Sequence, residues 1–396
     1  MKRMVGTVVR GIRGPIVKKG MDVAPIVVDC LLEAAKSESF EINDRDVIAV
    51  TESIVARAQG NYATIEDIAN DVKAKCNSDV IGVTFPILSR NRFATCLKGF
   101  AMAAKKIVIL FAYPSDEVGN HLMSLDDLEA SGINPWTDCL TEERYRQLFG
   151  DSVHPFTGVD YVTYYREIIE DCGAECEVIF SNNPCDILPL TDVVITCDTH
   201  TRERSKRHLK KGGGRIVLGM DDILNTESNE HGYNLDFGLL GSNKSSETSV
   251  KLFPRNCQPV VEQIQALVKE KTGKHIEAMI YGDGAFKDPV GKIWELADPV
   301  VSPAYTAGLD GTPNELKLKY LADNDFADLS SEEQAKAIEE YIRHKDTDLK
   351  GNMASQGTTP RRLTDLLGSL SDLTSGSGDK GTPFVFIQGY FDNYAD

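Results

Sequence analysis

Two loops of this sequence place cationic side chains among glycines. Residues 11–20 (GIRGPIVKKG) hold Arg13, Lys18 and Lys19, and residues 374–383 (TSGSGDKGTP) hold a further lysine between glycines. Glycine allows backbone N–H groups to approach an anion closely, and cationic side chains attract phosphate. Both loops therefore predict contacts with phosphate groups, although each one alone also suits an ordinary surface turn.

A third loop carries an acid between two glycines. Residues 281–288 (YGDGAFKD) place Asp283 directly after an apolar stretch. An Asp at the carboxyl end of a parallel strand is a suitable ligand for Mg²⁺ or Mn²⁺, although a Gly-Asp-Gly turn has the same spacing. The pair Asp221 and Asp222, and the basic cluster at 200–204 (HTRER), also suggest metal or carboxylate binding, but we favour the simpler interpretation of helix-capping acids and a solvated helix face.

Short apolar strands are expected to position these loops. The stretch 46–50 (DVIAV) reads as a buried strand that ends in a polar turn at 51–53. A helix over 259–272, with Gly273 just past its end, leads into a strand over 276–281. Further elements are a helix near 26–34 capped by Asp22, a helix near 65–75, a charged helical insertion over 325–352 with Ser330 and Glu333 as a capping box, a helix over 361–373 and a strand over 384–388.

The middle of the chain alternates strands and helices. Strands are expected at 107–113, 177–180 and 193–196, with helices at 160–171 and 201–211 between them. The segment contains neither G-x-G-x-x-G nor G-x-x-x-x-G-K-[ST], so no dinucleotide or P-loop site is assigned to it. The fold class is therefore α/β (α+β), a mixed-sheet core with an inserted βαβ-type layered subdomain, and the expected division is 1–85, 86–225 and 226–396.

Composition limits the class of protein. The chain has 396 residues, a formal charge of −17 and 41% hydrophobic residues. This charge argues against broad binding to nucleic acid or to anionic membranes. No apolar run reaches the roughly 20 residues that cross a bilayer, and the nine scattered cysteines form no C-x-x-C pair. We therefore expect a cytoplasmic protein with reduced thiols, no membrane contact and no nucleic-acid partner.

Taken in order, these loops resemble one family, the coenzyme F(420)-0:L-glutamate ligases. The stretch 14–22 (GPIVKKGMD) is similar to the nucleotide-binding segment of that family, and 46–61 (DVIAVTESIVARAQGN) is similar to its strand-turn motif. The stretches 231–243 and 276–289, and the loop 375–382, resemble three segments that hold metal and nucleotide. The resemblance implies nucleotide contacts at Gly14, Pro15, Ile16, Val17, Glu52, Ser53, Arg57, Asn243, Ser375, Gly376, Ser377, Gly378, Asp379, Lys380, Gly381 and Thr382.

Three positions depart from the family pattern. Leu240 stands where the family has a metal-binding Asp, Gly284 where it has a metal-binding Thr, and Ser377 where it has a Gln-type ligand. The resemblance still places Asp283 on a metal ligand and makes Asp283 and Arg57 the expected catalytic residues. The metal set that it implies is Asp283, Asp236, Asp288 and Asp379.

The activity implied by the resemblance is ligation of L-glutamate to a carboxylate-bearing coenzyme of deazaflavin or folate type. Amide formation from free carboxylates is uphill in water, so we expect GTP or ATP as phosphoryl donor and an acyl phosphate intermediate, with Mg²⁺ or Mn²⁺ and additionally K⁺ as cations. The family also implies a homodimer. Two alternatives stay open: an enzyme of another class that binds a nucleotide or sugar phosphate in the middle segment, and a catalytically altered family member that only binds a nucleotide or metabolite.

Overall fold

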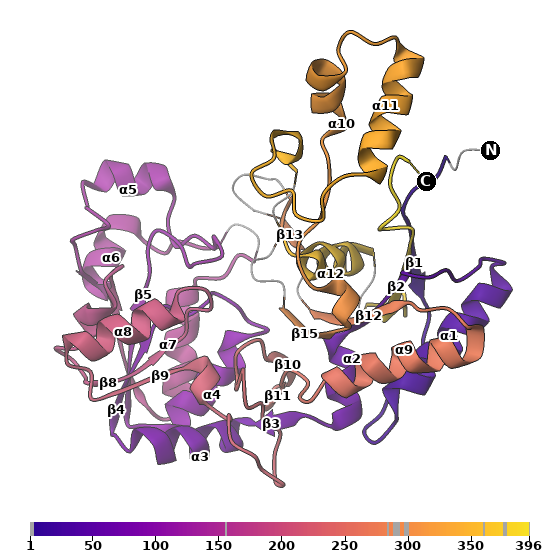
Figure 1. Cartoon of the computed structure of the whole chain (residues 1–396). Helices are drawn as coiled ribbons and strands as arrows, with labels where there is room; N and C mark the ends of the chain where they lie inside the picture. Colours follow the sequence, from indigo (N-terminus) through magenta and orange to yellow (C-terminus); the bar gives the residue numbers. More distant parts are fainter. Residues whose placement is uncertain are drawn as a thin grey trace. The chain divides into compact units, whose positions relative to one another are not determined.

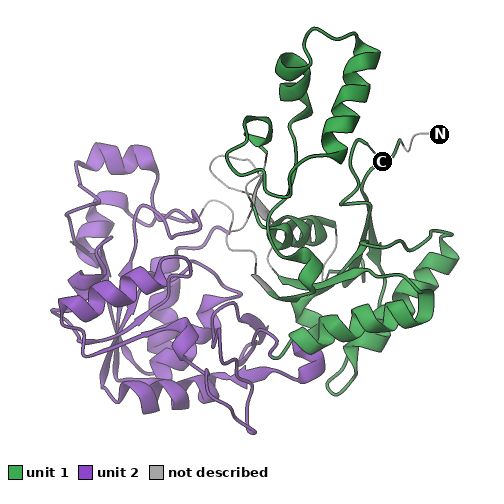
Figure 2. Ribbon diagram, in the orientation of Figure 1, with its two compact units in different colours: residues 1–55, 256–286, 296–396 green, residues 56–255, 287–295 purple. Residues whose placement is uncertain are grey.

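The computed structural model describes residues 4–154, 157–282, 285–287, 294–296, 301–358, 361–374 and 378–395. The chain divides into two compact units (Figure 2). Unit 1 comprises Met1–Val55, Asn256–Phe286 and Leu296–Asp396, and unit 2 comprises Ala56–Arg255 and Lys287–Glu295. Each unit contains a sheet covered by helices, with parallel and antiparallel strand pairs in both, which confirms the predicted mixed α/β class.

A five-stranded sheet forms the centre of unit 1 (Figure 1). Its order is β1-β16-β2-β12-β15, and only the central pair, β2 and β12, is parallel among the pairs described. All five positions of β16 and of β2 are buried. The strand bounds are β1 (Val8–Ile12), β2 (Val47–Thr51), β12 (Glu277–Gly282), β15 (Val301–Tyr305) and β16 (Phe384–Gln388).

Helices cover both faces of this sheet. Alternate strand residues, among them Val47, Met279 and Val385, pack against Leu363 and Leu367 of α12 (Leu363–Thr374). Their neighbours in the strands point to the opposite face, where α1 (Val23–Ser37) and α9 (Gln258–Thr272) lie side by side. Because both faces are covered, the strands read as continuous apolar runs rather than as alternating ones.

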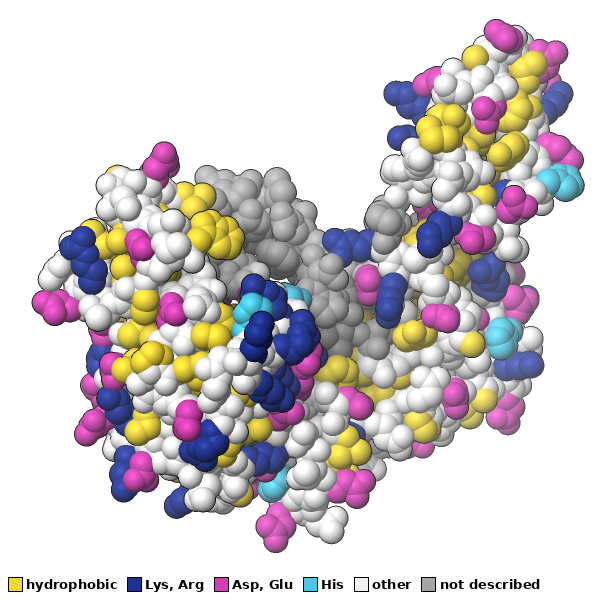
Figure 3. Space-filling model, turned by 60° about the vertical axis from the view of Figure 1, so that its left-hand side comes forward, with side chains coloured by type: hydrophobic (Ala, Val, Ile, Leu, Met, Phe, Trp, Pro, Cys, Tyr) yellow, Lys and Arg dark blue, Asp and Glu magenta, His cyan; other side chains and the backbone are white. Residues whose placement is uncertain are grey.

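Local capping chemistry fixes several helix ends as predicted. Asp22 accepts a hydrogen bond from the backbone N–H of Ala24 at the start of α1 (3.3 Å). Gly273 ends α9 with a φ of +75°, a conformation that glycine adopts without strain. Ser330 and Glu333 form the predicted capping box of α11 (Ser331–Arg343). In Figure 3, acidic and basic side chains alternate with hydrophobic ones on the visible face of this helical part of unit 1.

Unit 2 is built on a doubly wound sheet of order β6-β7-β5-β4-β8-β9. The strands from β7 to β9 are parallel, and the two-residue β6 is antiparallel. A second sheet has the order β10-β11-β3. The bounds are β3 (Tyr62–Thr64), β4 (Val80–Thr84), β5 (Lys106–Phe111), β6 (Leu140–Thr141), β7 (Glu175–Phe180), β8 (Val193–Thr196), β9 (Ile216–Gly219), β10 (Asn243–Ser246) and β11 (Ser249–Lys251).

The helices of unit 2 lie on opposite faces of its large sheet. The helices α3 (Ile65–Cys76), α4 (Phe93–Ala103) and α7 (Tyr161–Asp171) share a core with one face. The 3₁₀ turn η1 (Pro184–Ile187) and α8 (Arg202–Gly212) cover the other face. Unit 2 also contains α5 (Leu125–Ser131) and α6 (Glu142–Phe149). Elsewhere in the chain, α10 (Leu318–Tyr320) lies in unit 1, and β13 (Ala285–Lys287) pairs with β14 (Trp294–Leu296).

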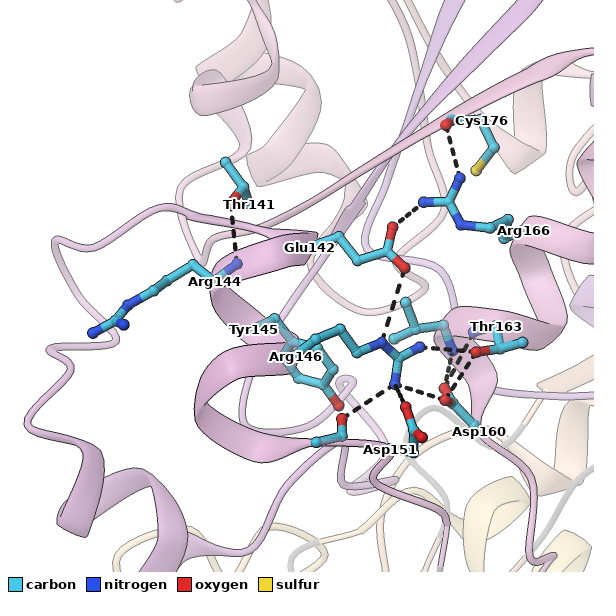
Figure 4. Close-up of polar contacts among 12 residues, drawn as sticks. Thr141, Glu142, Arg144, Tyr145, Arg146, Asp151, Asp160, Thr163, Arg166 and Cys176 are labelled. Carbon is cyan, nitrogen blue, oxygen red and sulfur yellow. Dashed lines mark hydrogen bonds and ion pairs between the residues drawn. The ribbon is translucent and has the colours of Figure 1, made fainter.

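Arg146 joins α6 to the start of α7 (Figure 4). Its guanidinium donates hydrogen bonds to Asp160 (2.7 Å) and Thr163 (2.9 Å), and it lies 3.4 Å from Asp151. Asp160 also caps α7 by accepting from two backbone N–H groups. Burial opposes ionisation of Asp160, but hydrogen bonds from Arg146 and Thr163 prevail and lower the pKa of its carboxyl.

Sequence reasoning misplaced two local elements. The expected turn at 51–53 is wrong, because the helix α2 (Glu52–Gln59) begins directly after β2; its Glu, Ala, Arg and Gln residues all favour a helix. The expected loop 11–20 overlaps β1, because Gly11 and Ile12 pair with β16. The compact units also divide at 55/56 and 255/256, whereas 85/86 and 225/226 were expected, because β4 pairs with β5 and β8 inside the sheet of unit 2.

Candidate functional site

One edge of the unit 1 sheet gathers several of the loops singled out from the sequence. In β1, β2 and β12 the chain runs toward this edge, and it leaves the edge in β15 and β16. The register shows this directly, because Tyr281 pairs with Thr51, Phe384 pairs with Val50 and Ile12, and Val301 pairs with Gly282. The carboxyl ends of parallel strands are the usual place for a ligand site in α/β folds.

Backbone hydrogen bonds hold two of these loops against each other. The N–H of Gly14 donates to the carbonyl of Gly381 (3.1 Å), and the N–H of Thr51 donates to the carbonyl of Pro383 (3.1 Å). The loop that follows β1 is thereby fixed to the loop that precedes β16, and the latter is fixed to the end of β2. Residues far apart in the sequence therefore form one continuous surface.

Two glycines make this close approach possible. A Cβ atom on Gly14 would lie 2.7 Å from Cε2 of Phe384, and a Cβ on Gly11 would lie 3.2 Å from Cβ of Thr382. Phe384 is fully buried and has no space to withdraw. The φ of Gly14 lies outside the left-handed region, so backbone conformation does not require glycine there. Glycine is needed because any side chain would collide with Phe384.

Cationic side chains dominate the exposed part of this edge. Arg13, Lys18, Lys19 and Lys380 are exposed on the two joined loops, together with the single acid Asp379. Such an excess of positive charge in a chain of net charge −17 favours a phosphate-bearing ligand.

Apolar side chains anchor and flank the first loop. Val17 is buried and fixes the loop to the core, whereas the side chain of Ile16 is 76% exposed. Pro15, Gly378, Gly381 and Thr382 complete the described backbone of this surface, and Gly381 has a φ of +66°. An exposed isoleucine beside a basic loop provides an apolar contact for the flat part of a ligand.

Glu52 and Ser53 begin α2 at the same edge. Glu52 is 6% exposed, so its carboxylate is held inside the end of the sheet, and Ser53 is partly exposed. The N-terminus of a helix favours negative charge, which accommodates this buried acid. Arg57 lies on the same helix but is exposed and belongs to unit 2.

Tyr281 is a candidate that sequence reasoning missed. It is the residue before Gly282 in β12, and its side chain is 1% exposed. Among the residues that the structure describes, none makes a hydrogen bond with its hydroxyl. Burial, followed by the nearby Asp372 carboxylate, raises the pKa of this hydroxyl well above its ordinary value. In the sequence, only its position two residues before Asp283 pointed to a role, because a tyrosine buried in an apolar strand does not by itself indicate a functional residue.

The expected metal ligands belong to both units and to segments outside the described ranges. Asp379 lies in unit 1, and Asp236 lies in unit 2, as does the expected nucleotide contact Asn243. Asp283, Asp288, Gly284, Ser375, Gly376 and Ser377 lie outside the described residues. Within the described ranges, no group of three His, Cys, Asp or Glu side chains is arranged to hold a metal ion. The described residues therefore do not by themselves build a metal site.

Leu240 belongs to the hydrophobic core of unit 2. It is buried and packs in the same cluster as Leu239 and Val250. The position at which the family pattern has an acid is thus filled by an apolar side chain inside a core. A cation cannot be coordinated there without rebuilding this packing.

Comparison with known proteins agrees with the resemblance seen in the sequence. The sequence model of the F(420)-0:gamma-glutamyl ligase family matches residues 11–389, which is nearly the whole chain. No curated protein matches the sequence. None of the helices in the described ranges combines the length and the apolar character needed to cross a bilayer.

Proposed function

This chain belongs to the F(420)-0:gamma-glutamyl ligase family, and from that premise we propose that the basic edge of unit 1 binds the nucleoside triphosphate that drives the ligation. The family implies an enzyme that forms a C–N bond, with L-glutamate and a deazaflavin-type coenzyme as substrates. The observation that carries the proposal is that the basic, glycine-containing loop after β1 is hydrogen-bonded to the one before β16, beside the carboxyl end of β2.

The described residues suit the binding of phosphates. Lys18 and Lys19 project from the first loop and Lys380 from the second, and the hydrogen bond from Gly14 to Gly381 holds the loops together. Backbone N–H groups and lysines provide both the directional and the charge component of phosphate binding. We prefer GTP, which the resemblance implies, and keep ATP as the alternative.

The chemistry follows from the need to activate a carboxylate. The acceptor carboxylate attacks the γ-phosphorus, the nucleoside diphosphate leaves, and an acyl phosphate forms. The glutamate amine then attacks the carbonyl carbon, inorganic phosphate leaves, and the nitrogen releases its proton to solvent. The lysines of the edge hold the charged oxygens in place during both steps.

A divalent cation is part of the proposal, with Asp283 as its expected ligand. The basis is the family resemblance together with the end of β12 at Gly282 on the same edge; Asp283 itself lies outside the described residues. Bound Mg²⁺ or Mn²⁺ would neutralise charge on the phosphates. The expected homodimer and the role of K⁺ stay predictions.

The decisive experiment measures product and nucleotide cleavage together. The protein is incubated with GTP or ATP, Mn²⁺, L-glutamate and a deazaflavin acceptor, and the γ-glutamyl product is followed by mass spectrometry. The double substitution Lys18→Met/Lys380→Met should raise the KM for nucleotide about tenfold or more, since each lysine supplies a charge-assisted contact. The control Lys36→Met, at an exposed lysine near the end of α1, should leave it unchanged.

A second candidate function is binding without turnover. The apolar packing of Leu240 favours it, because one family ligand is absent and its place is filled by core. Nucleotide binding with no product from any acceptor would select this alternative. If the Lys18→Met/Lys380→Met protein binds nucleotide as the wild type does, the basic edge is not the nucleotide site in either case.

A further inference from the structure

The large sheet of unit 2 has a topological switch point between β4 and β8. From β4 the chain moves outward through β5 and β7 on one side, and later through β8 and β9 on the other. The helices that follow β4 and β8 lie on opposite faces, since α4 shares one core cluster and Leu209 of α8 shares the other. In sheets of this kind the two diverging loops leave a crevice outside the carboxyl ends of the strands, where ligands bind.

Thr84 lies at this switch point, and its hydroxyl is of particular interest. It is the last residue of β4 and pairs with Thr196 of β8 on one side and Leu110 of β5 on the other. Its side chain is fully buried, yet no residue in the described ranges makes a hydrogen bond with Oγ1. Burying an unpaired hydroxyl costs free energy, whereas valine would fill the same space without that cost. The hydroxyl is therefore explained by a ligand more readily than by packing.

Glu117 crosses the end of β4 from the loop after β5. Its carboxylate accepts hydrogen bonds from the backbone N–H groups of Thr199 and of His200 (2.9 Å to His200), in the loop after β8. The sheet order places β4 between these two loops, so the carboxylate spans the strand that ends in Thr84. Burial raises the pKa of Glu117, because desolvation disfavours the charged carboxylate by more than the two backbone hydrogen bonds favour it.

The paired N–H groups form an anion-binding arrangement. They precede α8, and no described backbone N–H group of its first turn donates a hydrogen bond to the side chain of the N-cap residue Thr201. Adjacent N–H groups that approach a helix N-terminus bind the oxygens of carboxylates and phosphates. In this structure the Glu117 carboxylate supplies the two oxygens to which these N–H groups donate.

The nearby Asp198 does not compete for these donors. Its carboxylate accepts hydrogen bonds from the hydroxyls of Thr196, Thr201 (2.6 Å) and Ser205 (2.8 Å). It is buried and belongs to a self-contained network under α8. A ligand that displaced the Glu117 carboxylate would meet the two backbone N–H groups of Thr199 and His200, in the loop beside the strand that ends in Thr84.

We propose that this edge of unit 2 is a second ligand site, which binds the phosphate group of a small phosphorylated metabolite in place of the Glu117 carboxylate. A phosphate presents three oxygens, one for each of the N–H groups of Thr199 and His200 and one for Thr84. A ligand carboxylate presents only two and would merely exchange with Glu117. The proposal does not depend on the chemistry at the edge of unit 1.

The test uses the full-length protein with inorganic phosphate as the probe, titrated by calorimetry and by amide NMR. Phosphate should shift the amide signals of Thr199 and His200. Glu117→Gln removes the competing charge and should tighten phosphate binding about tenfold, whereas the control Glu203→Gln, at an exposed acid in the first turn of α8, should not change it. Thr84→Val should weaken binding about tenfold, and Thr84→Ser, which keeps the hydroxyl, should restore it.

A purely structural role gives the opposite pattern. Thr84→Val would then raise the melting temperature and leave phosphate affinity unchanged, which overturns the proposal. Phosphate-induced shifts confined to residues 13–19 and 378–382 would overturn it too, because they would assign the binding to unit 1. If Glu117→Gln does not fold, the comparison of Thr84→Val with Thr84→Ser still decides the question.

Discussion

Replacing Gly14 with alanine tests the contact that joins the two basic loops. The added Cβ would lie 2.7 Å from Cε2 of Phe384 and 3.0 Å from Cγ of Pro383, both closer than ordinary van der Waals contact. Phe384 is fully buried between neighbouring strands, so the ring cannot turn away without disturbing β16. The loop after β1 must therefore shift outward, and its hydrogen bond to Gly381 should weaken.

The size of the effect follows from two opposing contributions. Overpacking a well-filled site costs about 1–3 kcal/mol, while a Gly→Ala change restricts the unfolded chain and stabilises by about 0.4–1 kcal/mol. We therefore expect a net loss of about 1–2 kcal/mol in the free energy of unfolding, or roughly 2–8 °C in the melting temperature of a unit of this size. Nucleotide affinity should also fall, because the displaced loop carries Lys18 and Lys19.

The assay is thermal unfolding combined with nucleotide titration by calorimetry. Gly6→Ala is the matched control, because a Cβ there meets no described atom within 4 Å, its φ is not left-handed, and it lies outside the two joined loops. The double variant Gly14→Ala/Phe384→Leu should lose less stability than the sum of its single variants, since leucine lacks the Cε2 atom. Strict additivity, or a Gly14→Ala protein as stable as the wild type, would refute the proposed contact.

Two further predictions concern unit 2. Arg146→Met should destabilise the protein by roughly 2 kcal/mol, because it removes hydrogen bonds between charged groups that are only partly exposed, whereas the exposed Arg144→Met should change stability by less than about 0.5 kcal/mol. Because the pKa of Asp160 is lowered in the folded state, its ionised carboxylate stabilises the protein above the ordinary Asp pKa of about 4, and this stability is lost as the pH falls through the lower folded value. Between about pH 2 and 6, the range of carboxylate titration, the stability of Arg146→Met should therefore depend less on pH than that of the wild type. An unchanged pH dependence would contradict this. Iodoacetamide should alkylate the exposed Cys139 in the native protein before it reaches Cys76, whose burial raises its thiol pKa to about 11, as peptide mass mapping over time will show.

The elements with strong local signals follow from the sequence. The strands 193–196 and 384–388 have the predicted bounds, and α1, α3, α7, α9 and α12 lie within a few residues of prediction. These elements were predictable because their signals are local: apolar runs, capping acids, and glycines at helix ends. The family was equally accessible, because its motifs are short stretches whose order along the chain can be compared directly.

The elements with weak local signals were not predictable. The helix α2 follows β2 without any intervening turn, so Glu52 is buried at its start instead of lying in an exposed loop. Thr84 is the last residue of β4 and Tyr281 the last but one of β12, and neither hydroxyl has a hydrogen-bond partner among the described residues. The pattern of apolar residues in a strand does not show which side chains will find a hydrogen-bond partner. Such features depend on neighbours from distant parts of the chain.

What the sequence by itself determined is the set of loops with the chemistry for phosphate, the class of fold and the family. Only the tertiary structure decided which of these loops share a surface. Residues 14 and 381 lie at opposite ends of the chain and meet because β1 and β16 are paired antiparallel strands, while Asp236 and Asn243 fall in the other unit. The physical reason is that residue types fix local conformation and affinity for charge, whereas strand pairing and core packing, which join distant segments, fix position.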